Sequence, residues 1–292
     1  MNDSVQKPVM HPATAALLKG VVTSPPNSLG LVGLPGIGRK TLAEWIVRNL
    51  VDDPALELDE NQYCKVIATE NDISIKREQI KSILDFVKLK TIGKKNLRRF
   101  VVIDNADILT RDAQSALLKL LEEPPLDTMI ILLINNPQEL HDTVLSRLQL
   151  INIRKPSKEL VREHFKVDPK DFDKLYVLAE GLPGLLQSII DDPESHSLIL
   201  SLAKVRSLLA KTTYERLLIV NELSADKNEV KILLDVLSRL SKVSIDAAVD
   251  KGDVVAANKW LKILEGSAKA KDALNRNAKP KLTLTDLFLN LV

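Results

Sequence analysis

The stretch that most constrains this chain is an apolar run ending in acidic residues, Val101-Val102-Ile103-Asp104-Asn105-Ala106-Asp107. Three consecutive β-branched residues without a polar interruption are typical of a strand that is covered on both faces. The two aspartates follow where the strand ends. A strand of this kind predicts a parallel sheet with helices on both faces, and therefore an α/β fold for this part of the chain.

The acidic end of this strand has two interpretations. In a P-loop ATPase the first carboxylate after such a strand helps to hold Mg²⁺, and the next residue, usually Glu, polarises the attacking water. Here the next residue is Asn105, and an amide cannot take a proton from water. The sequence then has the scaffold of an ATPase without its base. In the alternative interpretation, Asp104 or Asp107 caps the following helix and does no chemistry.

A glycine-rich turn lies earlier in the chain. The apolar segment 29–32 is expected to form a short buried strand, and the helix 42–50 follows the turn. Strand, glycine-rich turn and helix form the context in which backbone N–H groups cradle a phosphate. The candidate nucleotide-binding residues are Gly33, Gly36, Gly38, Arg39, Lys40 and Thr41, together with Asp104 and Asp107.

The turn departs from the phosphate-binding motif G-x-x-x-x-G-K-[ST]. Counted from Gly33, the motif places Arg39 at the lysine position and Lys40 at the Ser/Thr position that would bind Mg²⁺. If Lys40 is the motif lysine instead, Leu34 and Arg39 fall on the glycine positions. A forked guanidinium replaces a compact ammonium, and a cation at the ligand position repels the metal. We therefore expect no cofactor. Two alternatives stay open: the loop binds ATP without hydrolysis, or it serves only as a tight turn.

Composition limits the function further. The 292 residues are 45% hydrophobic and 27% charged, which is typical of a soluble globular protein of two or three domains. A net charge of +2 argues against a protein whose main task is to coat nucleic acid. The basic residues Lys94, Lys95, Arg98 and Arg99 could touch DNA phosphate or form a solvated loop.

The single cysteine, Cys64, excludes an intramolecular disulfide and a multi-cysteine zinc site, and no metal site is expected. No stretch reaches the roughly 18 apolar residues that a membrane span requires, so no membrane contact is expected. An N-terminus without a long apolar run, taken with the lone cysteine, predicts a cytoplasmic protein.

Several motifs in one order carry a resemblance to a known family. They are the degenerate turn 33–38, the segment 104–107, Ala-Leu-Leu-Lys-Leu-Leu-Glu-Glu-Pro-Pro at 116–125, Ser-Arg at 146–147 and the last helix near 282–289. Together they resemble the delta-prime family of clamp-loader subunits of bacterial DNA polymerase III. The resemblance spans most of the chain and thins between about 195 and 270.

This resemblance implies an AAA+ P-loop-like domain with a parallel sheet at 1–155, a helical lid at 156–194 and an all-α collar for oligomerisation at 195–292. Subunits of this family work in a five-subunit ring with clamp-loader ATPase and delta subunits. The ring opens the sliding clamp and places it on primed DNA during replication.

The family's Ser-Arg pair corresponds to Ser146 and Arg147. The resemblance makes Arg147 an arginine finger for ATP held by a neighbouring subunit, and a guanidinium can spread positive charge over the γ-phosphate. The alternative is a surface arginine paired with a carboxylate. Leu148 replaces the family's cysteine, the family's four-cysteine zinc module is missing, and segment 185–187 lacks the arginine that active relatives place there.

Three hypotheses follow. The first is a non-hydrolysing delta-prime-like subunit that is catalytic only through Arg147. The second is a gamma/tau-like AAA+ ATPase that binds ATP itself through Lys40, with Asp104 and Asp107 on the metal. The third is a DNA-binding adaptor that acts through the basic segment 94–99.

Overall fold

The computed structural model describes residues 5, 7–68, 74–88 and 99–291, which form two compact units. The first unit comprises residues 1–166 with 182–185, and the second comprises residues 167–181 with 186–292. The three-part division at 155/156 and 194/195 stays a prediction.

The first unit is built on a five-stranded parallel sheet with the strand order β2-β3-β4-β1-β5. The strands are β1 (Ser28–Val32), β2 (Cys64–Ile67), β3 (Arg99–Ile103), β4 (Thr128–Ile134) and β5 (Gln149–Asn152). Because all strands run the same way, their carboxyl ends meet at one edge, where open α/β sheets bind ligands. The glycine-rich turn after β1, Asp104 after β3 and Asn135 after β4 all follow strands at this edge.

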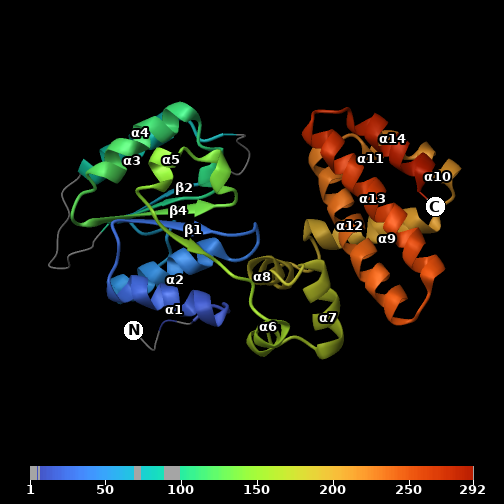
Figure 1. The fold of residues 1–292 in the computed structure, drawn as a ribbon, viewed down its shortest axis with the longest axis horizontal. Helices are drawn as coiled ribbons and strands as arrows, with labels where there is room; N and C mark the ends of the chain where they lie inside the picture. The colour runs from blue at the N-terminus through green and yellow to red at the C-terminus, as the bar shows by residue number, and fades with distance from the viewer. Residues whose placement is uncertain (1–4, 6, 69–73, 89–98, 292) are drawn as a thin grey trace. The chain divides into compact units, whose positions relative to one another are not determined.

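Helices cover both faces of this sheet (Figure 1): α1 and α2 lie on one face, and α3, α4 and α5 on the other. Phe100 and Val102 of β3 pack into the first layer, whereas Val101 and Ile103 pack into the second. The doubly covered strand and the α/β class predicted from the sequence are thereby confirmed. The helices of this unit are α1 (Pro12–Thr23), α2 (Arg39–Val51), α3 (Arg77–Lys88), η1 (Ala106–Ile108), α4 (Arg111–Glu122), η2 (Pro137–Glu139), α5 (Asp142–Leu145) and α6 (Lys158–His164).

Arg99 corrects the interpretation of the basic segment. This residue opens β3 and is only 5% exposed. Its Nη2 atom lies 2.7 Å from Asp127 Oδ1, and Nη1 donates to the carbonyl oxygens of Phe86 and Val87. A buried guanidinium is stable only with such partners, so Arg99 belongs neither to a solvated loop nor to a DNA contact. Lys94, Lys95 and Arg98 lie outside the described residues.

The second unit is helical. Its elements are α7 (Pro169–Leu178), α8 (Pro183–Asp191, whose first residues belong to the first unit), α9 (Ser197–Ala210), α10 (Thr213–Leu218), α11 (Val220–Leu223), α12 (Lys227–Asp250), α13 (Val254–Asn275) and α14 (Pro280–Asn290). The long helices α12 and α13 pack together, and α9 packs on α12. The apolar spacing at 214–223, typical of one helix, belongs to the two helices α10 and α11. The same spacing at 229–240 belongs to α12, which continues to Asp250 because no glycine or proline stops it before Gly252.

A buried arginine ties the ends of two helices together in this unit. Arg216 is 5% exposed. Its Nε and Nη2 atoms donate to the carbonyls of Leu208 (2.8 Å) and Leu209 (3.2 Å), in the last turn of α9. Its Nη1 atom donates to the carbonyl of Leu291 (3.0 Å), directly after α14. Carbonyls in the last turn of a helix lack the usual helical partners. The Leu208 carbonyl also accepts the N–H of Lys211 (3.2 Å), and the guanidinium adds a donor to all three carbonyls.

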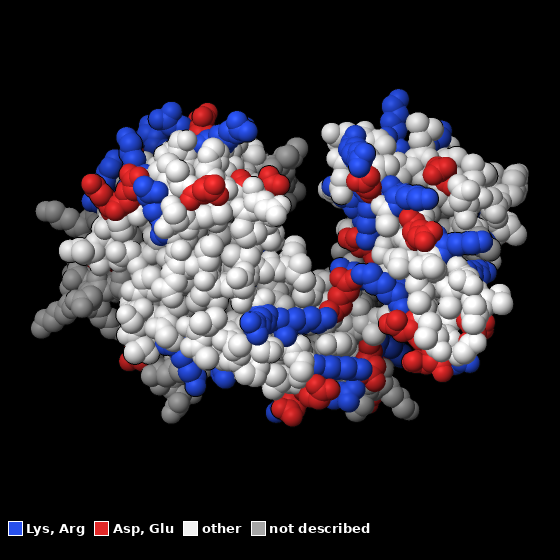
Figure 2. Space-filling model, in the orientation of Figure 1, with Lys and Arg blue, Asp and Glu red and all other residues white. Residues whose placement is uncertain are grey.

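The surface carries charges of both signs. Figure 2 shows basic and acidic side chains intermixed over α3 and α4, in keeping with the small net charge. No helix in the described part of the chain is long and apolar enough to cross a membrane.

Candidate functional site

The glycine-rich turn has the strand–turn–helix context expected of it. Gly36 (φ +83°) and Gly38 (φ +96°) adopt the left-handed backbone conformation that favours glycine. The carbonyl of Gly38 accepts the N–H of Leu42 (2.9 Å), so α2 begins at Arg39 and not at Leu42 as predicted. The three extra residues place Arg39 in the first turn of the helix.

The chain itself covers part of this turn. The backbone N–H of Leu185 donates to the carbonyl of Gly36 (2.9 Å). A Cβ atom added to Gly184 would lie 2.9 Å from the Gly36 oxygen and 2.9 Å from both N and Cα of Gly38. The first turn of α8 therefore packs directly on the glycines. The Gly-Leu-Pro-Gly sequence at 181–184 predicts a turn, but it does not predict which residues the turn contacts.

Arg39 points toward the acidic end of β3. The residue is 7% exposed, and its Nη2 atom lies 3.4 Å from Asn105 Oδ1. Its Nη1 atom is buried with no hydrogen-bond partner among the described residues. Burial lowers the pKa of the Arg39 guanidinium, while attraction from Asp104 and Asp107 raises it. The residue at the motif's lysine position is thus a desolvated cation close to two carboxylates.

Asn135, at the end of β4, organises the residues after β3. Its backbone N–H donates to Asp107 Oδ1 (2.8 Å), and its Nδ2 atom donates to both Asp107 oxygens (3.0 and 3.1 Å) and to Asn105 Oδ1 (3.0 Å). Asp104 Oδ1 accepts the N–H of Asn105 (2.8 Å), whose φ is +50°. These residues follow β3 and β4 at one edge of the sheet, and the structure joins them in one hydrogen-bonded cluster.

The capping interpretation of the two aspartates is wrong. The N-cap of α4 is Thr110, whose hydroxyl oxygen accepts the N–H of Ala113 (3.3 Å). Asp104 and Asp107 lie before this cap and bond to Asn105 and Asn135 instead. They stabilise the loop between β3 and α4.

Lys40 and Thr41 lie apart from this cluster. The Nζ atom of Lys40 is 2.6 Å from Asp59 Oδ2, and 44% of the Lys40 side chain is exposed. The hydrogen bond that Lys40 donates to Asp59 raises the pKa of the Lys40 ammonium. Thr41 is exposed on α2. Of the candidate binding residues, the structure therefore brings Arg39 toward Asp104 and Asp107 and turns Lys40 to a surface carboxylate.

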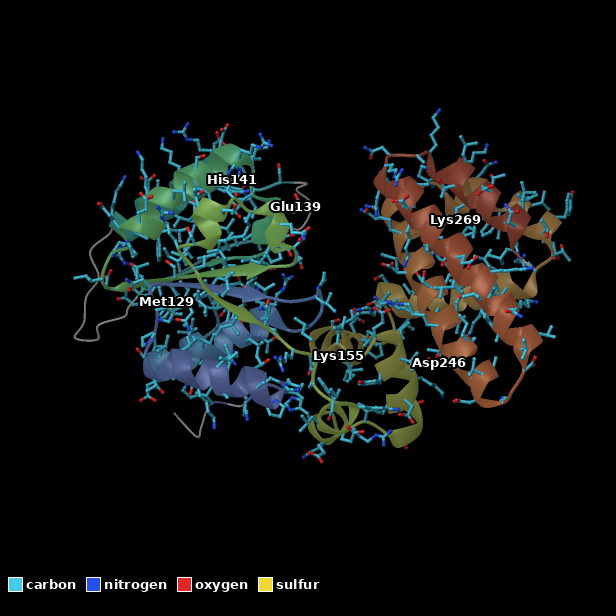
Figure 3. The ribbon with its side chains drawn as sticks, viewed as in Figure 1. Met129, Glu139, His141, Lys155, Asp246 and Lys269 are labelled. Atoms are coloured by element: carbon cyan, nitrogen blue, oxygen red, sulfur yellow. The ribbon has the colours of Figure 1, made fainter. Side chains whose placement is uncertain are left out.

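The segment that carries Arg147 is fixed by a buried glutamine. The Nε2 atom of Gln114, on α4, donates to the carbonyls of Leu109 and Glu139 (both 3.1 Å). Its Oε1 atom accepts the backbone N–H of His141 (2.8 Å); Figure 3 labels Glu139 and His141 beside the short helix α5. Gln114 is 3% exposed, so it anchors the start of α5 to the core of the first unit.

Arg147 follows α5 and is exposed. Its Nη2 atom lies 2.6 Å from Glu122 Oε1, and Nη1 donates to the carbonyl of Thr143 (2.7 Å). Ser146 is exposed and donates its hydroxyl to the same carbonyl (3.2 Å), with its oxygen 3.5 Å from Arg147 Nη1. The pairing with a carboxylate agrees with the alternative interpretation of Arg147. Sequence reasoning missed Glu122, although it lies within the quoted segment 116–125.

No metal site can be assigned within the described ranges, because no three His, Cys, Asp or Glu side chains gather there. Cys64 lies in β2, and burial raises the pKa of its thiol to about 12. The thiol is therefore protonated at neutral pH.

Comparisons with known proteins add to this geometry. The parallel sheet with its glycine turn, acidic strand end and covering helices forms an α/β fold that resembles AAA+ P-loop proteins. A DNA polymerase III gamma-subunit-related protein from Thermotoga maritima shares the fold, with a TM-score of 0.54 at 16% identity over 94% of this chain and 97% of that chain. Residues 26–157 match the family model described as DNA polymerase III, delta subunit. Over this stretch, a little under half of its length, the chain is similar to DNA polymerase III subunits.

Three relatives show how far the sequence similarity extends. DNA polymerase III subunit delta' of Bacillus subtilis is 38% identical over 79 residues, which cover 27% of this chain and 23% of the relative. DNA polymerase III subunit gamma of Buchnera aphidicola is 27% identical over 256 residues, which cover 76% of this chain and 70% of the relative. The chain also matches replication factor C small subunit 1 of Pyrobaculum islandicum at 30% identity, over 46% of that protein's length. This chain thus spans less than half the length of the Bacillus subtilis and Pyrobaculum islandicum proteins.

Proposed function

We propose that this chain is a non-hydrolysing, delta-prime-like subunit of the DNA polymerase III clamp loader. It contributes to catalysis by donating Arg147 to ATP held on a neighbouring subunit. The observation that carries the proposal is the orientation of Arg39 toward Asp104 and Asp107. These are the carboxylates that would serve Mg²⁺ in an active P-loop site.

The residues around the glycine turn do not fit Mg-ATP. The motif's lysine position holds a buried guanidinium, and the position of the metal-binding hydroxyl holds Lys40, which pairs with Asp59. The first turn of α8 packs on the glycines that would approach phosphate. Asn105 stands where a water-polarising carboxylate is needed. These four features support a chain that does not turn over ATP.

Arg147 fits the role of a residue offered to a partner. It is exposed, it sits on a segment anchored by Gln114, and its guanidinium can contact a phosphate group outside the chain. A finger arginine stabilises the charge that develops on the transferred phosphoryl group. The proposed neighbours are the clamp-loader ATPase and delta subunits of a five-subunit ring in the cytoplasm, which acts on the sliding clamp and primed DNA.

The first test is the DNA-stimulated ATPase rate of the reconstituted loader with the wild-type chain or with Arg147→Ala. Loss of a finger costs on the order of a thousandfold at the site it serves, although other sites in the ring dilute the observed fall. Size-exclusion chromatography of both loaders controls for assembly. An unchanged rate with assembly intact would make Arg147 structural and reject the proposal.

The second candidate is a gamma/tau-like ATPase that binds ATP itself through Lys40. It predicts micromolar Mg-ATP binding by the isolated chain that Lys40→Ala abolishes. The pairing of Lys40 with Asp59 weighs against it. A calorimetric titration without heat or binding would reject this candidate, whereas binding sensitive to Lys40→Ala would replace the first proposal.

The third candidate, a DNA-binding adaptor, loses Arg99 as a contact because that side chain is buried against Asp127. It predicts tight binding of the isolated chain to primed DNA with a steep loss of affinity on adding salt. Weak binding that hardly changes with salt would reject it.

A further inference from the structure

The contacts of Arg147 involve a second residue of the same chain. Glu122 is the last residue of α4 and lies 25 positions before Arg147 in the sequence. Its Oε1 atom accepts from Arg147 Nη2 at 2.6 Å, a short charge-assisted hydrogen bond. The carbonyl of Thr143 accepts from Nη1 at 2.7 Å. Two acceptors on different helices therefore hold the two ends of the guanidinium fork.

The contacts of Arg147 leave part of the fork open. A guanidinium has five N–H donors. Glu122 accepts one from Nη2, while Thr143 and, at 3.5 Å, the Ser146 hydroxyl accept from Nη1, so a donor on Nη2 and the Nε–H remain. The side chains of Arg147 and Glu122 are 34% and 47% exposed, so the pair reaches the surface. An arginine free in solution samples many rotamers and loses that freedom when it binds. Contacts that fix the guanidinium in advance reduce this loss.

We propose that Glu122 is a positioning residue for Arg147: it holds the guanidinium so that the remaining N–H donors face the phosphate group of a neighbouring subunit. This inference rests on the proposed function of Arg147 as a finger. Glu122 does not itself touch the nucleotide. Its carboxylate acts only through Arg147, in the way that a supporting shell orders the groups of an active site.

In the opposite interpretation of the same contact, Glu122 holds Arg147 away from the phosphate. This interpretation predicts the opposite effect on the rate. If Glu122 competed with phosphate for Arg147, removal of its charge would raise the rate of the partner's site. If Glu122 positions Arg147, the removal lowers the maximal rate. Because a finger acts on the transition state, the fall appears in kcat with KM for ATP unchanged.

The experiment compares DNA-stimulated ATPase rates of loaders assembled with Glu122→Gln, Arg147→Ala and the double variant. The matched control is Glu123→Gln, which removes the neighbouring exposed carboxylate. Because an exposed ion pair contributes little, we expect Glu122→Gln to lower kcat at the served site by roughly threefold. Glu123→Gln is expected to leave kcat unchanged, and the double variant is expected to match Arg147→Ala, because Glu122 has nothing left to position.

The outcomes separate the two levels of the proposal. An unchanged or higher kcat for Glu122→Gln overturns the positioning role, and so does an equal fall with and without Arg147. A fall in Glu123→Gln that equals the fall in Glu122→Gln also overturns it, since the effect would then follow net charge. If Arg147→Ala itself has no effect with assembly intact, the finger proposal fails, and the positioning role fails with it.

Discussion

Arg39 and Arg147, two arginines of the first unit, lie in different surroundings. Arg39 is buried between the glycine turn and the carboxylates after β3, whereas Arg147 is exposed and shares its guanidinium between Glu122 and a backbone carbonyl. Removing a charge from water is costly, so a buried cation depends on the charges fixed around it. An exposed ion pair contributes little and exchanges partners easily. Burial therefore confines Arg39 to contacts within its own chain. Exposure allows Arg147 to exchange Glu122 for an acceptor on another molecule.

The largest effect is expected from Arg147→Lys. Lysine keeps the charge but loses the planar fork that contacts phosphate through two donors. We expect the loader's ATPase rate at the served site to fall on the order of a hundredfold or more, nearly as far as with Arg147→Ala. The exposed Arg154, changed to Lys in the same way, is the matched control. A Lys variant as active as the wild type would reduce the role of Arg147 to charge alone.

A second prediction concerns the covered glycine turn. Gly184→Ala places a methyl group 2.9 Å from backbone atoms of Gly36 and Gly38, and backbone cannot move aside cheaply. We expect the free energy of unfolding of the first unit to fall by about 1–3 kcal/mol, measured by urea denaturation of the chain. Gly20→Ala, in α1 with no atom within 4 Å of the new Cβ, is the control and is expected to stabilise by about 0.5–1 kcal/mol. Equal stability of the Gly184 variant and the wild type would show that α8 leaves the turn easily.

A third prediction tests whether the motif residues close the site. The double change Arg39→Lys with Lys40→Thr restores G-x-x-x-x-G-K-T from Gly33 onward. We expect the isolated variant to bind Mg-ATP at least about tenfold better than the wild type, a gain of about 1.4 kcal/mol. It is expected not to hydrolyse ATP, because Asn105 remains. Calorimetry at millimolar ATP measures the gain in affinity. If the variant binds no better than the wild type, the contact of Gly184 with the turn is what prevents nucleotide binding.

The smallest effect concerns Lys40 and pH. The pKa of Lys40 is raised in the folded chain by its hydrogen bond to Asp59. A raised folded-state pKa adds stability that is fully present below the unfolded value of about 10.4 and is lost as pH rises through the folded value. Lys40→Met is therefore expected to cost about 0.5 kcal/mol at pH 8 and less at pH 11. A cost that does not change with pH would mean that the pairing with Asp59 does not stabilise the fold.

Local patterns predicted the framework well. The apolar run at β3 predicted a central strand, and the run at β4 is of the same kind. The helices α1 and α14 begin at a proline, and Ser157 caps α6, as rules on caps and proline expect. These signals lie within a few residues of the element that they specify. The local sequence therefore specifies the sheet and most of the helices.

The site was predicted in outline but not in its contacts. Lys40 meets Asp59 at a separation of 19 residues, Arg147 meets Glu122 at 25 and Arg99 meets Asp127 at 28. No local pattern specifies a partner at such distances, because the tertiary fold brings the two residues together. For the same reason, the sequence did not predict the burial of Arg99, although this residue lies next to the apolar run of β3.

The contacts of Arg216 bear on how the protein is made. Its guanidinium bonds to carbonyls of α9, which are synthesised before it, and to the carbonyl of Leu291, which is synthesised 75 residues later. During translation the nascent bundle thus holds a cation whose last partner has not yet left the ribosome. The sheet of the first unit, by contrast, is complete once β5 has emerged. The first unit can fold while the second is still being translated, and the second can close only after α14 is released.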